Sequence, residues 1–135
     1  MQITGSCLCG EVQFDISDNF ESFYLCHCSR CRKATGTVHG ANLFNTKATL
    51  NWLQGKQLVK RYNLPDTRFT KSFCSECGSP VPTEIGDKIA IVPAGSLNSS
   101  PNINPTAHIF CDDRASWEDL LGDTKRLAVY PHNKS

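Results

Sequence analysis

The chain has 135 residues, of which 39% are hydrophobic and 20% are charged, and this balance is typical of a soluble globular protein rather than a disordered one. Its 14 basic and 13 acidic residues give a net charge of +1, without the clustered basic excess of a nucleic-acid-binding surface. The length predicts one domain, spanning residues 1–135.

Strand patterns account for most of the chain. The earliest clear pattern covers residues 11–16, which alternate strictly and put Val12, Phe14 and Ile16 on one face. Further strands are expected at residues 22–25, 41–44, 50–53, 58–62, 68–73, 88–92 and 107–110. Gly, Pro, Asn and Asp separate these runs, and such punctuation is typical of an all-β domain.

Helical patterns are few and short. Residues 29–35 are expected to form one or two turns, with Ser29 as the N-cap and Gly36 as the left-handed residue that ends the helix. A second short helix is expected at residues 112–121, and the polar tail at 130–135 is expected to fray. The predicted fold is therefore mainly β, with small sheets tied together by zinc and one or two short helices.

The spacing of the cysteines points to metal binding. Seven of the eight fall into three tight groups, which are Cys7 and Cys9, then Cys26, Cys28 and Cys31, then Cys74 and Cys77, and they leave Cys111 alone. Thiols two or three residues apart are poorly placed to form disulfides with each other but well placed to share a soft, tetrahedral metal ion.

The cellular compartment bears on whether these thiols stay reduced. The chain begins without the charged leader and apolar run of a signal peptide, and its longest apolar stretch, residues 89–94, is too short to cross a membrane. These features predict a cytoplasmic protein without a membrane partner, and clustered cysteines in the cytoplasm favour metal over disulfides.

The two cysteine pairs predict a four-thiolate, structural zinc site. Cys7 and Cys9 would point to the same face of a strand, because side chains alternate there. Cys74 and Cys77 have the spacing of a zinc knuckle, and Gly78 tolerates the conformation needed just after the second ligand. Structural zinc contributes roughly 10–16 kcal/mol in small peptides, whereas a domain has a net stability of only about 5–15 kcal/mol. The metal is therefore expected to decide whether the chain folds.

The remaining group offers three thiolates to a second zinc: Cys26, Cys28 and Cys31. Three protein ligands leave an open position, which is the arrangement of reactive zinc. His27 would point away from its cysteine neighbours and is not expected to be the fourth ligand. Two alternatives stay open at this point, because Cys111 could close the site or Cys9 could join the group.

Three thiolates leave the zinc site with a net charge of −1, so it acidifies bound water less than three neutral histidines would. Such a site suits a substrate sulfur as its fourth ligand, or an oxygen next to that sulfur. Arg30, Arg32 and Lys33 lie close in sequence and could receive the carboxylates of a substrate.

Three other residues are expected to serve packing. Cys111 follows the apolar run at 107–110, where a small buried thiol commonly fills space. Trp52 and Trp117 are expected to lie in the core.

Three segments resemble one known family: GSCLCGEVQF at 5–14, CHCSRCRKATG at 26–36 and FCSECGSP at 73–80. They are similar to the glutathione-dependent formaldehyde-activating enzyme family, which also includes centromere protein V. GSL at 95–97, HIF at 108–110 and Trp117 look like its closing signature.

The resemblance implies a mainly β fold with two zinc ions. The structural ion would be held by Cys7, Cys9, Cys74 and Cys77, and the catalytic ion by Cys26, Cys28 and Cys31. It also implies a carbon–sulfur lyase that acts on an adduct of glutathione, or another small thiol, with a small carbonyl such as formaldehyde. The alternative function is a non-catalytic zinc-binding interaction module.

Overall fold

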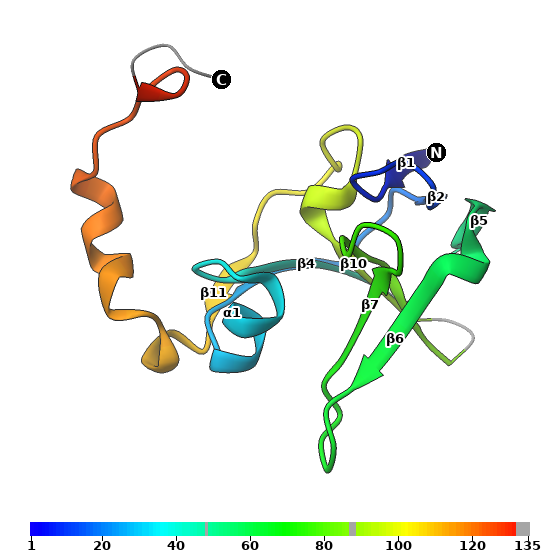
Figure 1. Ribbon diagram of the computed structural model, residues 1–135, viewed down its shortest axis with the longest axis horizontal. Coiled ribbons are helices and arrows are strands. Elements are labelled where there is room, and N and C mark those ends of the chain that lie inside the picture. The colour runs from blue at the N-terminus through cyan, green and yellow to red at the C-terminus, as the bar shows by residue number, and fades with distance from the viewer. Residues whose placement is uncertain (48, 87–88, 132–135) are drawn as a thin grey trace.

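A computed structural model describes residues 1–47, 49–86 and 89–131 of the chain (Figure 1). The fold is mainly β and consists of three small sheets with one α-helix and short 3₁₀ helices, so the predicted fold class is confirmed. The first sheet has the strand order β1 (Gln2–Ser6), β2 (Gln13–Ser17) and β5 (Asn51–Gln54).

In the first sheet, β1 and β2 are antiparallel, with Ile3 opposite Ile16 and Gly5 opposite Phe14. The apolar side chains of this alternating pattern are buried. Gly5 lets the strands and the 3₁₀ helix η2 (Ala94–Ser96) approach, because a Cβ there would lie 2.3 Å from Phe14 Cζ and 2.6 Å from the carbonyl oxygen of Ser96. A side chain at this position would force the sheet apart.

The second sheet has five strands, in the order β11 (Ala107–Ile109), β3 (Ser22–Cys26), β4 (Gly40–Asn45), β10 (Ile89–Pro93) and β9 (Thr83–Ile85). The side chains on the two faces of this sheet differ in how deeply they are buried. Leu43 and Val92 are fully buried on one face, whereas Phe44 lies opposite Ile91 on the other face and both are only half-buried. The second face is therefore free to line a cavity.

The third sheet consists of β6 (Val59–Asn63), β7 (Thr70–Cys74) and β8 (Pro80–Val81). Figure 1 shows β6 and β7 as a long hairpin that extends beyond the other two sheets. Trp52 is half-buried and packs against both hydrophobic clusters of the molecule, one around Phe14 and Leu43 and one around Val12 and Cys74.

The eight strands predicted from the sequence are present, with ends that differ by one or two residues. Lys88, the first residue of one predicted strand, lies outside the described residues, and so do residues 132–135 of the predicted frayed tail. The sequence did not predict β1, β8 or β9. These strands are short or interrupted by Gly5 and Pro80, so no alternating apolar pattern marks them.

The helix α1 (Ser29–Thr35) has the predicted bounds but a different N-cap. Cys28 rather than Ser29 caps it, because Cys28 has extended backbone angles and its Sγ accepts a hydrogen bond from the backbone N–H of Cys31 at 3.4 Å. Gly36 ends the helix as predicted, with φ of 70° and an N–H that donates to the carbonyl oxygen of Arg32 at 2.7 Å.

The C-terminal segment follows β11 and contains two 3₁₀ helices, η3 (Cys111–Asp113) and η4 (Ser116–Asp123), in place of the single predicted helix. It runs up one side of the molecule, away from the three sheets (Figure 1). Trp117 is 50% exposed here, so its predicted place in the core was wrong. No helix among the described residues is long and apolar enough to cross a membrane.

Candidate metal centres and the adjoining cavity

Four cysteine sulfurs converge at one end of the first sheet. The Sγ atoms of Cys7, Cys9, Cys74 and Cys77 all lie within 4.8 Å of one another. Cys9 Sγ lies 3.6 Å from Cys7 Sγ and 3.9 Å from Cys74 Sγ. Four thiolates at about 2.3 Å from a tetrahedral zinc would be about 3.8 Å apart. The four side chains therefore fit an ion of this size and preference.

Cys7 and Cys9 reach this cluster from a turn, so the predicted strand geometry was wrong. Strand β1 ends at Ser6, and the backbone N–H of Gly10 donates to the carbonyl oxygen of Cys7 at 3.2 Å. The turn directs both sulfurs inward and leaves Leu8 between them 85% exposed. The N–H of Val12 donates to Cys7 Sγ at 3.3 Å, as expected for a sulfur that carries negative charge.

Cys74 and Cys77 form the predicted knuckle. Gly78 has φ of 78°, and its N–H donates to the carbonyl oxygen of Cys74 at 2.7 Å, which closes the turn around the two sulfurs. A hydrogen bond with Ser79, whose Oγ lies 3.3 Å from Cys77 Sγ, lowers the pKa of Cys77 to about 5. The N–H of Leu8 donates to the same Oγ at 3.1 Å, so Ser79 joins the knuckle to the other cysteine pair.

The second cluster contains the three sulfurs of Cys26, Cys28 and Cys31, again within 4.8 Å of one another. Cys26 ends β3, Cys28 caps α1, and Cys31 lies in the first turn of that helix. Burial raises the pKa of Cys26 and of Cys31, because a lone thiolate is poorly solvated there. A bound cation would compensate the charge, so the donor set fits a soft metal ion.

The two remaining alternatives concerned Cys9 and Cys111. Cys9 lies with the four-cysteine cluster and not with the group of three. Cys111 is exposed in η3 and belongs to neither cluster. Its predicted role as a buried packing residue was wrong, because the apolar strand ends at Ile109 and the chain turns outward at Phe110, which has φ of 57°.

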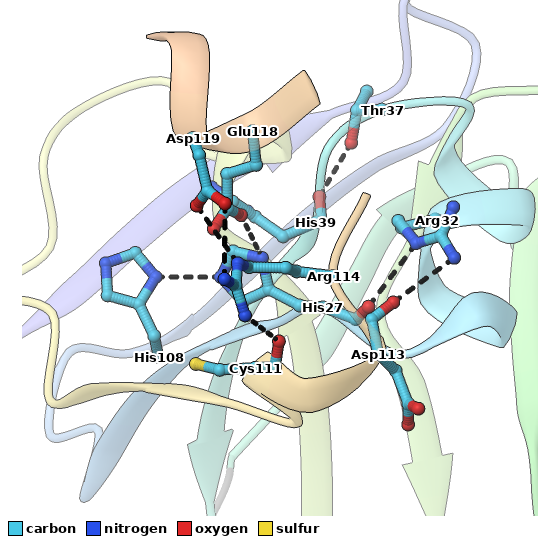
Figure 2. A network of polar contacts seen from close by, with 10 residues as sticks. All are labelled: His27, Arg32, Thr37, His39, His108, Cys111, Asp113, Arg114, Glu118 and Asp119. Atoms are coloured by element: carbon cyan, nitrogen blue, oxygen red, sulfur yellow. Dashed lines mark hydrogen bonds and ion pairs between the residues drawn. The ribbon is translucent and has the colours of Figure 1, made fainter. Parts of the chain in front are cut away.

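His27, which lies between Cys26 and Cys28 in the sequence, is the buried centre of a histidine network (Figure 2). His27 is fully buried, and its Nε2 lies 2.8 Å from Nδ1 of His108, while its Nδ1 contacts Oε1 of Glu118. Burial lowers the pKa of His27 and favours the neutral ring. A carboxylate only accepts hydrogen bonds, so the single proton of the ring lies on Nδ1 and Nε2 accepts from His108. Both nitrogens of His27 are thus occupied away from the sulfurs.

His39 completes this network through an edge-to-face contact with His27, with ring centroids 5.0 Å apart. The members of the group come from four separate places in the chain: His27, His39, His108 and Glu118. Neither sequence spacing nor periodicity predicts that such residues meet. The pairing of β11 with β3, for example, is what brings His108 to His27.

Among the three basic residues near the second cluster, Arg32 is the one that forms hydrogen bonds to other described segments of the chain. Its Nε donates to the carbonyl oxygen of His27 at 3.4 Å, and its Nη2 donates to that of Asp113 at 3.2 Å (Figure 2). Arg30 and Lys33 are exposed on α1. Arg32 therefore joins residues 26–32, which carry the second cluster, to the C-terminal segment, whereas Arg30 and Lys33 face solvent.

A cavity of about 250 Å³ adjoins the second cluster, and Cys31 lies in its wall. The other walls come from the free face of the five-stranded sheet and from β7 and β8, which contribute Phe44, Ile91 and Val81 among others. Gly40 lies beside Cys31, since a Cβ there would be 3.6 Å from Cys31 Sγ. Lys71 and Arg68 also line this cavity and bring positive charge to it.

The fold and the sites together define a β protein with two cysteine clusters of metal-binding geometry, one of them beside a cavity. A family model described as glutathione-dependent formaldehyde-activating enzyme matches residues 2–113, and the chain belongs to this family. Membership supports a glutathione-related, formaldehyde-activating function.

Among solved structures, the chain is similar to a crystal structure of a Rhodobacter sphaeroides protein from a structural-genomics programme. The TM-score is 0.55 and the sequence identity is 21%, with 78% of this chain and 99% of the other chain covered. At this identity the likeness shows the fold alone. No curated protein matches the chain.

Proposed function

We propose that this protein is a zinc-dependent carbon–sulfur lyase that acts on an adduct of glutathione, or another small thiol, with a small carbonyl. The observation that carries the proposal is the position of Cys31, which belongs to a three-sulfur cluster and also lies in the wall of a cavity. A structural metal site needs no such access, whereas a reactive site must admit a substrate.

The proposed ligand sets follow the two clusters. Cys7, Cys9, Cys74 and Cys77 would hold a structural zinc, and Cys26, Cys28 and Cys31 a catalytic one. A zinc ion with three thiolate ligands supplies Lewis acidity and affinity for a substrate sulfur or for an oxygen beside it.

The chain itself would orient the adduct. Lys71 Nζ donates one hydrogen bond to the carbonyl oxygen of Ala34 at 2.8 Å, so the ammonium lies at the α1 end of the cavity with donors left over. Arg68 adds a second cation at the same cavity. Glutathione carries two carboxylates, and these two side chains are the proposed receptors for them.

The reaction balances without a redox partner. The thiol sulfur forms a bond to the carbonyl carbon, the carbonyl π bond opens, and the thiol proton ends on the oxygen. The reverse direction breaks the same carbon–sulfur bond. The chain's contribution is to hold sulfur and carbonyl carbon in contact within the cavity and to exclude competing water.

Cobalt substitution tests the proposal, because cobalt bound by thiolates reports changes in its ligands as colour. We expect glutathione to change the absorption spectrum of the cobalt protein, and the Cys31→Ser variant to lose that response. Cys111→Ser is the matched control, since this cysteine belongs to neither cluster, and it is expected to respond like the unmodified chain.

An unchanged spectrum at saturating glutathione, together with no formaldehyde–glutathione reaction above the uncatalysed rate, would overturn the proposal. The non-catalytic zinc-binding interaction module would then take its place.

A further inference from the structure

The side chains that line the cavity beside Cys31 differ in polarity along its length. Strand β4 runs through one wall from Gly40, next to Cys31, to Phe44, and four residues of strand extend about 13 Å. Asn42 lies near the cysteine end, whereas Phe44 at the far end lies opposite Ile91 of β10. Along β4 the wall therefore carries an amide near the sulfur cluster and a pair of apolar side chains farther away.

The remaining lining is mostly apolar as well. Phe69 precedes β7 and Pro93 belongs to β10, and both add apolar surface. The hydroxyls of Ser72 and Thr83, which also line the cavity, are hydrogen-bonded to each other at 2.8 Å. The cation of Lys71, by contrast, is held at the end of α1 by its hydrogen bond to Ala34. The charge of Lys71 thus lies beside the helix that carries Cys31, whereas Phe44 and Ile91 present apolar side chains on the sheet.

Formaldehyde has no substituent that could use this apolar end. A dry cavity of about 150 Å³ in another protein holds a benzene ring, and the cavity here is larger, at about 250 Å³. The charged groups of glutathione suit the cations of the cavity and not its apolar end, because burying them against apolar walls would be unfavourable. The chemistry of the walls fits a hydrocarbon chain attached close to the reacting sulfur.

We infer that the carbonyl substrate of this protein is an aldehyde with an apolar side chain of several carbons, which lies in the cavity against Phe44 and Ile91. This inference rests on the proposed function and specifies its substrate class. The thiol's carboxylates lie toward Lys71 and Arg68, and the aldehyde's chain extends along β4. The reaction remains the thiol addition written above, with one of the two hydrogens of formaldehyde replaced by an alkyl group.

A binding series tests the inference without any turnover. S-alkylglutathiones from methyl to octyl imitate the adduct, and their Kd can be measured by calorimetry with the metal-loaded protein. Each buried methylene contributes about 0.8 kcal/mol, so Kd is expected to fall about fourfold per added carbon until the cavity is full. A Kd that stays constant, or rises, from methyl onward would overturn the inference.

The reaction itself should show the same trend. For straight-chain aldehydes from formaldehyde to octanal, the catalysed kcat/KM is divided by the uncatalysed rate constant of the same aldehyde, which removes differences in intrinsic reactivity. This ratio is expected to rise with chain length and then to fall once the chain exceeds the cavity. A ratio that is highest for formaldehyde would contradict the inference.

Two variants should shift the preferred length in opposite directions. Ile91→Trp shortens the cavity and is expected to move the optimum to shorter chains, whereas Phe44→Ala enlarges it and is expected to move the optimum to longer ones. Ile89→Trp is the matched control, because Ile89 lies on the same strand but does not line the cavity. It is expected to leave the optimum where it is.

The outcomes separate this inference from the function on which it rests. If glutathione changes the cobalt spectrum but chain length has no effect on Kd or rate, the substrate class is wrong and the lyase proposal stands. If glutathione has no effect on the spectrum and no aldehyde reacts above background, both are wrong. The Kd and kcat/KM series measured with the unmodified chain test the inference even where a variant fails to fold.

Discussion

Cys77 and Cys31 are both half-buried members of cysteine clusters, yet their surroundings act on them in opposite directions. The hydrogen bond with Ser79 lowers the pKa of Cys77 to about 5 and stabilises its thiolate. Burial raises the pKa of Cys31, so that its thiolate needs a nearby cation. Cys77 lies in the knuckle that it forms with Cys74, whereas Cys31 lies in the wall of the cavity.

We therefore predict different effects when each is replaced by serine. Cys77→Ser should remove one of four ligands from the site that joins the two halves of the chain. It is expected to lower the free energy of unfolding by more than about 3 kcal/mol. Cys31→Ser should leave the fold nearly as stable and lose one bound metal ion. Thermal unfolding followed by circular dichroism, with metal content by elemental analysis, measures both effects.

Cys111→Ser provides the control for these variants, because it removes an exposed thiol from outside the clusters. It should keep both ions and the melting temperature of the unmodified chain. Equal destabilisation by Cys31→Ser and Cys77→Ser would mean that the group of three is structural as well.

At the scale of whole elements, a few polar contacts attach the C-terminal segment to residues 26–32, which carry the second cluster. Arg32 of α1 bridges to Asp113, and His27 contacts Glu118 of η4 (Figure 2). Most apolar side chains of η4 are exposed, including Leu120 at 65%, so apolar packing contributes little to holding it. Glu118 also lies beyond the residues that the family model matches.

Replacing Glu118 should loosen this attachment. Glu118→Ala leaves the buried Nδ1–H of His27 without an acceptor, and we expect a loss of about 1–3 kcal/mol in stability. Glu118→Gln keeps an acceptor oxygen and should lose less. Hydrogen exchange of residues 114–123 should become faster in the alanine variant, as measured by mass spectrometry.

The neighbouring Asp119→Asn serves as the matched control. Asp119 pairs with Arg114 on the exposed surface, and this ion pair lowers the pKa of Asp119. Pairs of this kind are weak in water, so the variant should leave hydrogen exchange in η4 nearly unchanged. Equal effects of Glu118→Ala and Asp119→Asn would show that the buried contact adds nothing.

At the scale of the whole molecule, the four-cysteine cluster joins elements far apart in sequence. It brings the turn after β1 to the knuckle after β7, and the buried residues around it include Val12 and Val81. This second hydrophobic cluster is small, since only four of its residues are buried. A metal ion at its centre is expected to supply a large share of the stability.

Chelation should therefore proceed in two stages. A strong chelator should first remove an ion from the group of three, which adjoins the cavity, with no change in the circular dichroism spectrum. A second ion should leave more slowly, and its release should coincide with loss of β structure. The number of ions released is followed with a colorimetric metal indicator during the spectral measurement.

The Cys31→Ser variant tests this order, because it should show only the slow stage. Simultaneous release of both ions with unfolding would contradict the distinction between the two sites. Release of both without any spectral change would show that the fold does not depend on metal.

The sequence by itself determined the β character, most strand positions and the grouping of seven cysteines. These features are local, because they rest on alternation along strands and on thiols two or three residues apart. The left-handed end of α1 at Gly36 was predictable for the same reason. Local reasoning failed at Cys7 and Cys9, where a turn closed by the hydrogen bond from Gly10 to Cys7 replaces the expected strand.

Only the tertiary structure decided which distant residues meet. The parallel pairing of β11 with β3 brings His108 to His27, and the packing of α1 against β4 and of β8 against β10 forms the cavity beside Cys31. It also decided that Cys111 and Trp117 are exposed, since the chain turns outward after Ile109. Contacts of this kind depend on how sheets pack in space, and they cannot be predicted from spacing along the sequence.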